Sequence, residues 1–220
     1  FYDPDTGLNW LNSRFNTAFT NCQDHGQAAA KHWVRADANG HPRVVSAAER
    51  GSAGYELGLA LHYLTDLTQP MHACNFTQLS SHPINWYHGA VETFAMEHQA
   101  SVSPPAGFSS PNGPRGLACP HRDTDGCSAA ACCDLGLYAK MAARNSKDLH
   151  APTLIDVAGS QYYGWDRDPT YWAGVVNKRL VPMLQDAIRV TAQFLVGWIE
   201  LAKQGSDWFD NYGPVWKVVP

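Results

Sequence analysis

The sequence predicts an all-α protein, and three observations support that fold class. Hydrophobic residues make up 45% of the 220 residues and charged residues 16%, which is typical of a folded chain rather than a disordered one. Alternating runs of Val, Ile and Thr, the pattern of half-buried strands, are few. Apolar residues instead recur in steps of three and four, most clearly at Leu184, Ile188, Thr191, Leu195, Trp198 and Ala202. We therefore expect residues 1–220 to form a single compact multi-helix domain.

Start and stop signals locate the expected helices. Ser46 and Glu49 form a capping box at the start of a helix that runs to about Leu67, and Pro70 ends this helix. Residues 101–126 are rich in Pro, Gly and Ser and are expected to form a long loop. The remaining helices are expected over residues 11–36, 86–99, 129–145 and 181–204, with one more beginning near Asp168.

The composition and the missing motifs exclude several classes of function. The formal net charge is −4 and no block of Lys and Arg occurs, so no stable nucleic-acid partner is expected. No run of about 18 apolar residues occurs, which argues against a transmembrane helix. The chain also lacks a G-x-S-x-G nucleophile elbow, a Walker A loop, an H-E-x-x-H helix and a dinucleotide-binding Gly fingerprint.

Six cysteines bear on the compartment in which the protein works. Their even number, and the four that lie close together in a Pro/Gly-rich region, favour a secreted, oxidised protein with up to three disulfide bonds. Two alternatives stay open: reduced thiols in a cytosolic protein, and a small zinc knuckle built from Cys119, His121, Cys127 and Cys132. The knuckle ranks lower because its ligand spacings are irregular. The six are Cys22, Cys74, Cys119, Cys127, Cys132 and Cys133.

The densest group of chemistry-bearing residues lies between positions 62 and 92. His62 and Asp66 are four residues apart, as are His88 and Glu92, so on a helix each pair would project from one face. Imidazole nitrogen and carboxylate oxygen are suitable zinc ligands. His72 lies on the turn after the first helix and could reach back toward it. One such pair alone would be an ordinary structural contact, but two pairs and a third His favour a metal site.

The helix that would carry His62 and Asp66 is apolar over most of its circumference. The remaining narrow arc holds Gly58, His62, Thr65 and Asp66 rather than the Lys, Glu or Gln of a solvated face. We therefore expect this helix to be buried. A buried Asp66 would require a paired charge or a metal ion, because an isolated buried carboxylate is costly.

The segment that contains these residues resembles the core signature of a known family. Residues 58–77, GLALHYLTDLTQPMHACNFT, are similar to the zinc-dependent phospholipase C family, of the bacterial phosphatidylcholine-preferring type. The stretches FYDPD from Phe1 and RVTA from Arg189 extend the resemblance over most of the chain, with the Cys-rich loop as an insertion. The resemblance implies an all-α fold, up to three zinc ions, and hydrolysis of phospholipids to diacylglycerol and a phosphorylated head group.

The resemblance also assigns roles to individual residues. His62 and Asp66 would bind a first zinc, with Asp66 also bridging to a third, and His72, His88 and Glu92 would bind a second. Asp66 and Glu92 are therefore the candidate catalytic residues. Because the chain starts at Phe1, the family's further N-terminal ligands and its general base would lie upstream, so the domain is expected to lack that segment. The expected partner is phospholipid at a membrane or micelle surface, acted on by a monomer or by a chain associated with the missing segment.

Other functions compete with the phospholipase. The related P1/S1-type nucleases and 3′-nucleotidases share the architecture but usually have Asp at the position of Glu92. A non-catalytic, zinc-stabilised secreted binding protein is a further alternative, and a disulfide-stapled helical domain without metal is the third. The aromatic residues after the last expected helix fit either a membrane interface or packing onto the domain. They are Trp208, Phe209, Tyr212 and Trp216.

Overall fold

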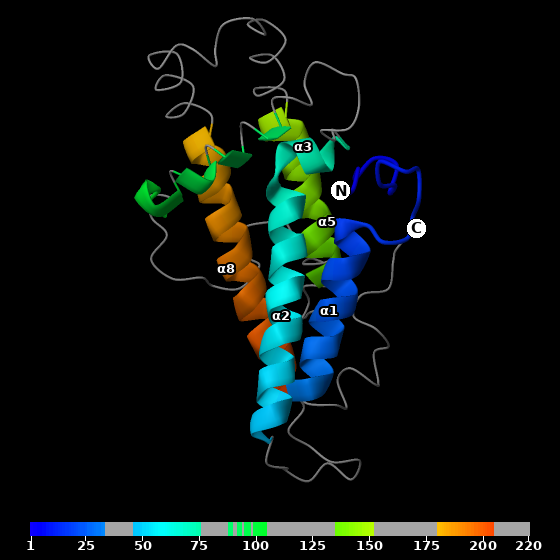
Figure 1. The fold of residues 1–220 in the computed structure, drawn as a ribbon, viewed down its shortest axis with the longest axis vertical. Coiled ribbons are helices and arrows are strands. Elements are labelled where there is room, and N and C mark those ends of the chain that lie inside the picture. Colours follow the sequence, from blue (N-terminus) through cyan, green and yellow to red (C-terminus); the bar gives the residue numbers. More distant parts are fainter. Residues whose placement is uncertain are drawn as a thin grey trace, which may run out of the picture. The chain divides into compact units, whose positions relative to one another are not determined.

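A computed structural model confirms the all-α prediction (Figure 1). Within the part of the chain that the structure describes, extended backbone pairs at an isolated bridge between Asp3 and Leu8 and forms no strand. None of the described helices combines the length and the apolar composition that a bilayer crossing requires. The described residues are 1–33, 46–75, 88–89, 92–93, 95–97, 99–104, 135–151 and 180–204.

The helices include four long elements and several single turns. The long helices are α1 (Ala18–Trp33), α2 (Ala47–Thr68), α5 (Leu135–Asn145) and α8 (Val181–Gln204). The short elements are the one-turn helix α3 (Pro70–Ala73), the 3₁₀ turn η1 (Gln99–Ser101) and the π-helical turn η2 (Ser146–His150).

The chain divides into two compact units. We call the first the site unit; it comprises Phe1–Thr17, Asp66–Ser109 and Ala142–Val190. We call the second the bundle unit; it comprises Ala18–Thr65, Ser110–Met141 and Thr191–Pro220.

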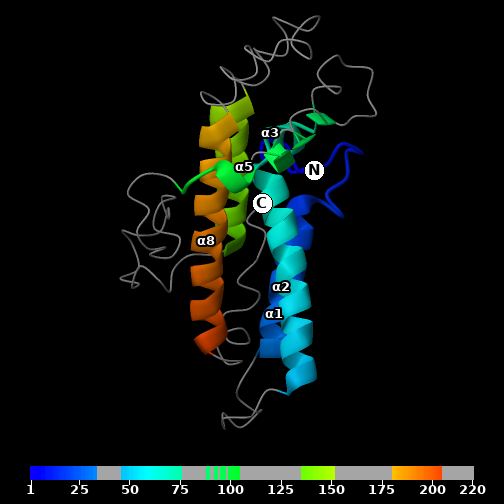
Figure 2. The ribbon, with the colours of Figure 1, turned by 60° about the vertical axis from the view of Figure 1, so that its left-hand side comes forward.

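The bundle unit is held together by side chains that connect its helices. His25 Nδ1 of α1 lies 2.6 Å from Glu56 Oε2 of α2, and both views show α1 beside the first part of α2 (Figures 1 and 2). Trp198 Nε1 of α8 donates to the carbonyl oxygen of Gly26 in α1 at 3.1 Å. The core of this unit is apolar. Its buried members include Phe19, Ala29, Ala30, Ala60, Leu64, Phe194 and Trp198.

The site unit is organised around charged contacts to the N-terminal segment. Lys147 Nζ lies 2.7 Å from both Asp3 Oδ1 and Asp5 Oδ2. Arg144 adds a hydrogen bond from its guanidinium to the carbonyl oxygen of Pro4 at 3.2 Å. One Lys therefore clamps both ends of the Asp-Pro-Asp turn against the turn η2.

The site unit contains a second charged group. His150 Nε2 lies 2.8 Å from Asp186 Oδ2, and the guanidinium of Arg189 donates to Asp186 Oδ1 at 3.0 Å. The hydrogen bond from His150, followed by that from Arg189, lowers the pKa of Asp186 below its usual value even though partial burial opposes the shift.

The first expected helix begins seven residues later than the periodicity suggested, at Ala18 rather than residue 11. Asn9 Oδ1 accepts hydrogen bonds from the backbone N–H groups of Leu11 and Ser13 at 2.9 and 3.0 Å, which makes a turn instead of a helical start. Asn12 and Asn16 take left-handed φ values of 56° and 53°, which no continuous helix allows. Residues 34–36 lie outside the described part of the chain.

The capping box at the start of α2 is confirmed. Ser46 N–H donates to Glu49 Oε2 at 2.8 Å, and Glu49 N–H donates to Ser46 Oγ at 3.2 Å. The stop before Pro70 is also confirmed, because α2 ends at Thr68. The helix over residues 181–204 and the end of the helix at Asn145 agree with expectation as well.

Three disulfide bonds, the upper limit of the prediction, would need all six cysteines, and the two described cysteines are unpaired. Cys22 and Cys74 are both free thiols, Cys22 buried and Cys74 half-buried. Burial raises the pKa of both, that of Cys74 to about 11, so both are protonated and unreactive at neutral pH. The other four cysteines, the predicted loop at 105–126, the helix near Asp168 and the aromatic tail lie outside the described residues, and their pairing and structure stay predictions.

The capping box gives the first stability test. Ser46→Ala removes the acceptor for Glu49 N–H, and we expect it to lower the free energy of unfolding by about 1 kcal/mol. Urea unfolding followed by circular dichroism measures the change. Ser52→Ala, an exposed position inside the same helix, is the control and should not destabilise. Equal stabilities of Ser46→Ala and the native chain would contradict the capping role.

The lowered pKa of Asp186 gives a test by pH. Because its folded pKa lies below the unfolded value of about 3.9, the stability it contributes is present above the unfolded pKa. That stability is lost as the pH falls through the folded pKa. The stability gap between the native chain and Asp186→Asn should therefore shrink between pH 6 and pH 3 in urea titrations. Asp24→Asn, which removes an exposed carboxylate on α1, should show no such convergence.

Candidate metal centre

The backbone after α2 places His72 on a separate, rigid turn. Pro70 stands at the start of α3, where its missing N–H costs nothing, and Gln69 caps the turn by accepting from His72 N–H through Oε1 at 3.0 Å. Pro70, Met71 and Ala73 are buried, so the turn is anchored on three of its four residues. His72 is therefore held in one orientation by the chain on both sides of it.

His88 and Glu92 present the helical four-residue spacing that the sequence predicted. His88 Nε2 lies 2.9 Å from Glu92 Oε1. The His88 side chain is only 4% exposed, whereas that of Glu92 is 44% exposed. The pair thus has a buried imidazole end and a carboxylate that borders solvent.

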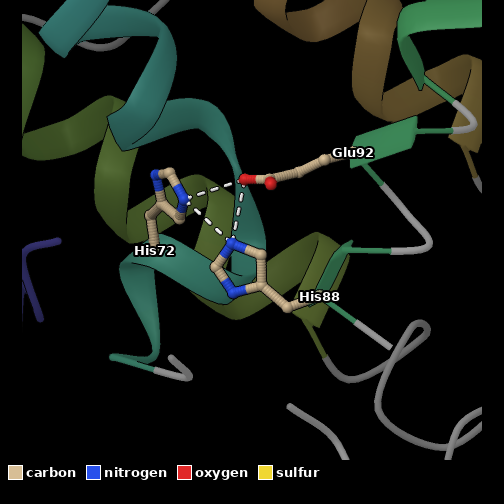
Figure 3. Close-up of side chains that lie close together, drawn as sticks. All are labelled: His72, His88 and Glu92. Atoms are coloured by element: carbon tan, nitrogen blue, oxygen red, sulfur yellow. Dashed lines mark hydrogen bonds and ion pairs between the residues drawn. The ribbon is translucent and has the colours of Figure 1, made fainter. Parts of the chain in front are cut away.

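The three side chains converge on one point (Figure 3). His72 Nε2 lies 3.1 Å from His88 Nε2 and 3.2 Å from Glu92 Oε1. With the contact between His88 and Glu92, all three atom pairs are about equally spaced, so the atoms form a nearly equilateral triangle. This group is the candidate metal centre, and it could hold a metal ion.

The donor set and spacing suit a tetrahedral cation. Zinc bonded to nitrogen or oxygen at 2.0–2.1 Å would separate neighbouring ligand atoms by roughly 3.3 Å. The observed edges of 2.9–3.2 Å are slightly shorter than this separation. Among the described residues three ligand atoms converge, and three protein ligands are also the number that catalytic zinc sites use.

Asp66 supports the centre through the other ring nitrogen of His72. Asp66 Oδ1 lies 3.2 Å from His72 Nδ1, an ion-pair distance. A carboxylate behind a ligating His fixes the ring and makes its free nitrogen a better ligand. Asp66 is in the last turn of α2, and His72 is in α3, which begins at Pro70. The short connection between the two helices therefore brings Asp66 and His72 together.

The charges of the centre hold Glu92 ionised. A hydrogen bond from His72, together with the neighbouring His88, lowers the pKa of Glu92 to about 2 against the opposing effect of burial. Burial acts to lower the pKa of His72, but the carboxylates of Asp66 and Glu92 outweigh it and raise that pKa. Glu92 is thus ionised at neutral pH, which suits it to bind a cation.

Sequence reasoning missed residues that hold His72 in place. The Phe1 ring packs on the rings of His72 and His88, with centroids 4.4 and 5.6 Å apart. Tyr2 N–H donates to the carbonyl oxygen of His72 at 3.2 Å. The Gln-Pro dipeptide at 69–70 was a usable signal for a capped turn, whereas the contacts of Phe1 and Tyr2 span some seventy positions and leave no local pattern.

Of the five predicted ligands, three are brought together as a group. His72, His88 and Glu92 form the centre, and Asp66 adjoins it through His72. His62 belongs to the bundle unit, where its ring packs edge-on against Tyr63 with centroids 5.2 Å apart. Its assignment as a ligand stays a prediction.

The expectation that the polar arc of α2 is buried was wrong. Gly58, His62 and Thr65 are exposed, and the Asp66 side chain is 23% exposed. Apolar residues around most of a helix did not exclude an open face, because protein surfaces are themselves more than half apolar. Asp66 is held by His72 rather than by complete burial.

Comparisons with known proteins place the chain beside phospholipases. No family model matches. Two proteins named phospholipase C from Bacillus cereus are each 31% identical over 215 residues, which is 97% of this chain and 62% of theirs. A phospholipase C from Listeria monocytogenes is 34% identical over 94 residues, 43% of this chain and 27% of its own. The chain spans less than two thirds of these relatives, and the expected resemblance to bacterial phospholipase C is confirmed.

The contact between Asp66 and His72 generates a test. Asp66→Asn keeps the shape but removes the charge, and we expect zinc affinity to fall about 10–100-fold at unchanged stoichiometry if Asp66 acts by positioning His72. Competition with a chromophoric chelator measures both quantities. Loss of a whole zinc equivalent would instead show a ligand. Glu56→Gln, which alters the His25 contact of the bundle unit, is the matched control and should leave both unchanged.

Proposed function

We propose that this chain, which is similar to phospholipase C over 97% of its residues, works as a zinc-dependent phosphodiesterase of that type. Its substrate would be a phosphatidylcholine-like phospholipid, cleaved to diacylglycerol and a phosphorylated head group. The observation that carries the proposal is the convergence of His72 Nε2, His88 Nε2 and Glu92 Oε1 within 3.2 Å of one another.

The roles of the residues follow from their chemistry. His72 and His88 would hold zinc through Nε2, and Glu92 would supply the anionic ligand. Bound zinc would neutralise phosphate charge and favour ionised water as the attacking group. Asp66 and the Gln69 cap would keep the His72 ring aimed at the ion, and Phe1 would shield one side of both rings from water. The half-exposed Glu92 leaves the centre open to a substrate.

The finer parts of the proposal rest on the resemblance. A further zinc at His62 and Asp66, and a total of up to three, are what the family resemblance implies, and the loss of a whole zinc equivalent in Asp66→Asn would establish that further ion. Secretion is proposed from the six cysteines, of which the four outside the described residues remain able to pair. A monomer acting at a membrane or micelle surface is the simplest assembly for a lipid substrate.

The nuclease alternative is separated by substrate. It shares the expected zinc chemistry, but its family usually carries Asp where this chain has Glu92. Glu places its carboxylate one methylene farther from the backbone than Asp, and Glu92 Oε1 lies 3.2 Å from His72 Nε2 and 2.9 Å from His88 Nε2. The binding-protein alternative would hold zinc and hydrolyse neither kind of substrate.

Hydrolysis and metal content together test the proposal. The zinc-loaded chain should cleave phosphatidylcholine in mixed micelles, and His88→Ala and Glu92→Ala should each lose bound zinc and roughly 100-fold or more of the activity. Release of phosphorylated head group and the metal content after dialysis are the measurements. His25→Ala, which breaks a His–carboxylate contact elsewhere, is the control and should keep both properties.

Three outcomes would overturn the proposal. Cleavage of single-stranded nucleic acid or 3′-nucleotides without cleavage of phosphatidylcholine would establish the nuclease. Stoichiometric zinc without hydrolysis of either substrate would establish a binding protein. Activity that survives both substitutions would refute the assigned ligands.

A further inference from the structure

The bundle unit contains a cavity that the metal chemistry does not use. Its volume is about 440 Å³, within the range of small-molecule sites. It lies among α1, α2 and α8 of that unit, lined by Trp33, Ala53, Gly54, Leu57, Leu195 and Trp198, with Ile199 beside them.

The cavity has a floor and a mouth. Ala53 and Trp198 are 1% and 4% exposed and form the closed side. Gly54 and Ile199 are exposed, Ile199 by 42%, and mark the open side. A Cβ atom built on Gly54 would meet no heavy atom within 4 Å, so a larger side chain fits at this position without a backbone clash.

The lining selects hydrocarbon. Among the described lining residues, none carries a charge, a hydroxyl or an amide side chain. The indole N–H of Trp198 is already used, because it donates to the carbonyl oxygen of Gly26 at 3.1 Å. A polar ligand would lose its hydrogen bonds to water without replacement, which strongly disfavours its entry.

We propose that this cavity binds a single fatty acyl chain. A cavity of about 150 Å³ holds one benzene ring, so roughly three times that volume takes on the order of 18 carbons. A straight acyl chain of that size, with its polar end left beside the exposed lining residues Gly54 and Ile199, satisfies both the volume and the apolar lining. The site is separate from the proposed hydrolysis and would give the protein a hold on lipid that needs no metal.

Binding of saturated fatty acids below their micelle concentration tests the proposal. Titration calorimetry should show affinity rising about fourfold per methylene from 8 to 12 carbons and levelling off near 18. A chain brominated at its middle should quench tryptophan fluorescence, because Trp33 and Trp198 line the cavity. These assays contain no phosphodiester, so their outcome is independent of the proposed phospholipase activity.

Two glycines of α2 provide matched variants. Gly54→Leu places a large side chain in the lining and should weaken binding at least tenfold, whereas Gly51→Leu, also exposed but outside the lining, should leave it unchanged. Both exchange Gly for a better helix former, so helix stability does not separate them. Equal binding by the two variants, or affinity that ignores chain length, would overturn the proposal. So would a dimer in sedimentation that Gly54→Leu dissociates while no fatty acid binds, since a second copy would then occupy the cavity.

Discussion

The site unit depends on one backbone constraint, the proline at position 70. Pro70 has no N–H to continue the ladder of α2, so the helix ends at Thr68 and a new turn begins one residue later. This change of direction puts His72 Nδ1 within 3.2 Å of Asp66 Oδ1, which an uninterrupted helix would keep on different faces. The other imidazole nitrogen is thereby turned toward His88 and Glu92. A single missing hydrogen-bond donor therefore sets the geometry of the candidate metal centre.

The balance of charge explains why such a centre is stable enough to exist. Two imidazoles and two carboxylates lie in mutual contact, and each His is paired with at least one acid. A buried imidazole nitrogen pair at 3.1 Å is unfavourable unless a proton or a metal ion lies among the lone pairs. The half-exposed Glu92 lets the anionic member keep part of its hydration. The arrangement is therefore suited to taking up a cation and to passing solvent or substrate to it.

The two units differ in the kind of side-chain contact that stabilises them. The site unit contains several ion pairs. They are the contacts of Lys147 with Asp3 and Asp5, the contacts of Asp186, and those of the candidate metal centre. The bundle unit instead packs small and aromatic side chains, and the space these leave is an apolar cavity. The candidate metal centre and the apolar cavity are thus built from different segments of one chain.

The sequence by itself determined the features that depend on neighbours within one turn. Helical periodicity predicted the all-α class, the box at Ser46 and Glu49 predicted the start of α2, and the spacing of His88 and Glu92 predicted a shared face. Each of these signals is local, so it survives whatever the rest of the chain does. The same local rules misplaced the start of α1, because the Asn9 side chain offered the backbone an alternative turn.

Only the tertiary structure decided which candidates meet. His72 lies sixteen positions from His88, and no periodicity relates residues on separate elements, so spacing alone could suggest their 3.1 Å contact but could not establish it. The exposure of the Gly58–His62 arc was also decided by packing, since an apolar helix pattern does not say which neighbours arrive. The cavity beside Gly54 has no sequence signal, because it is the space that several side chains fail to fill. The spacing of residues along the chain identifies the candidate reactive groups. The distances between these groups are set only when segments that are distant in the sequence pack together.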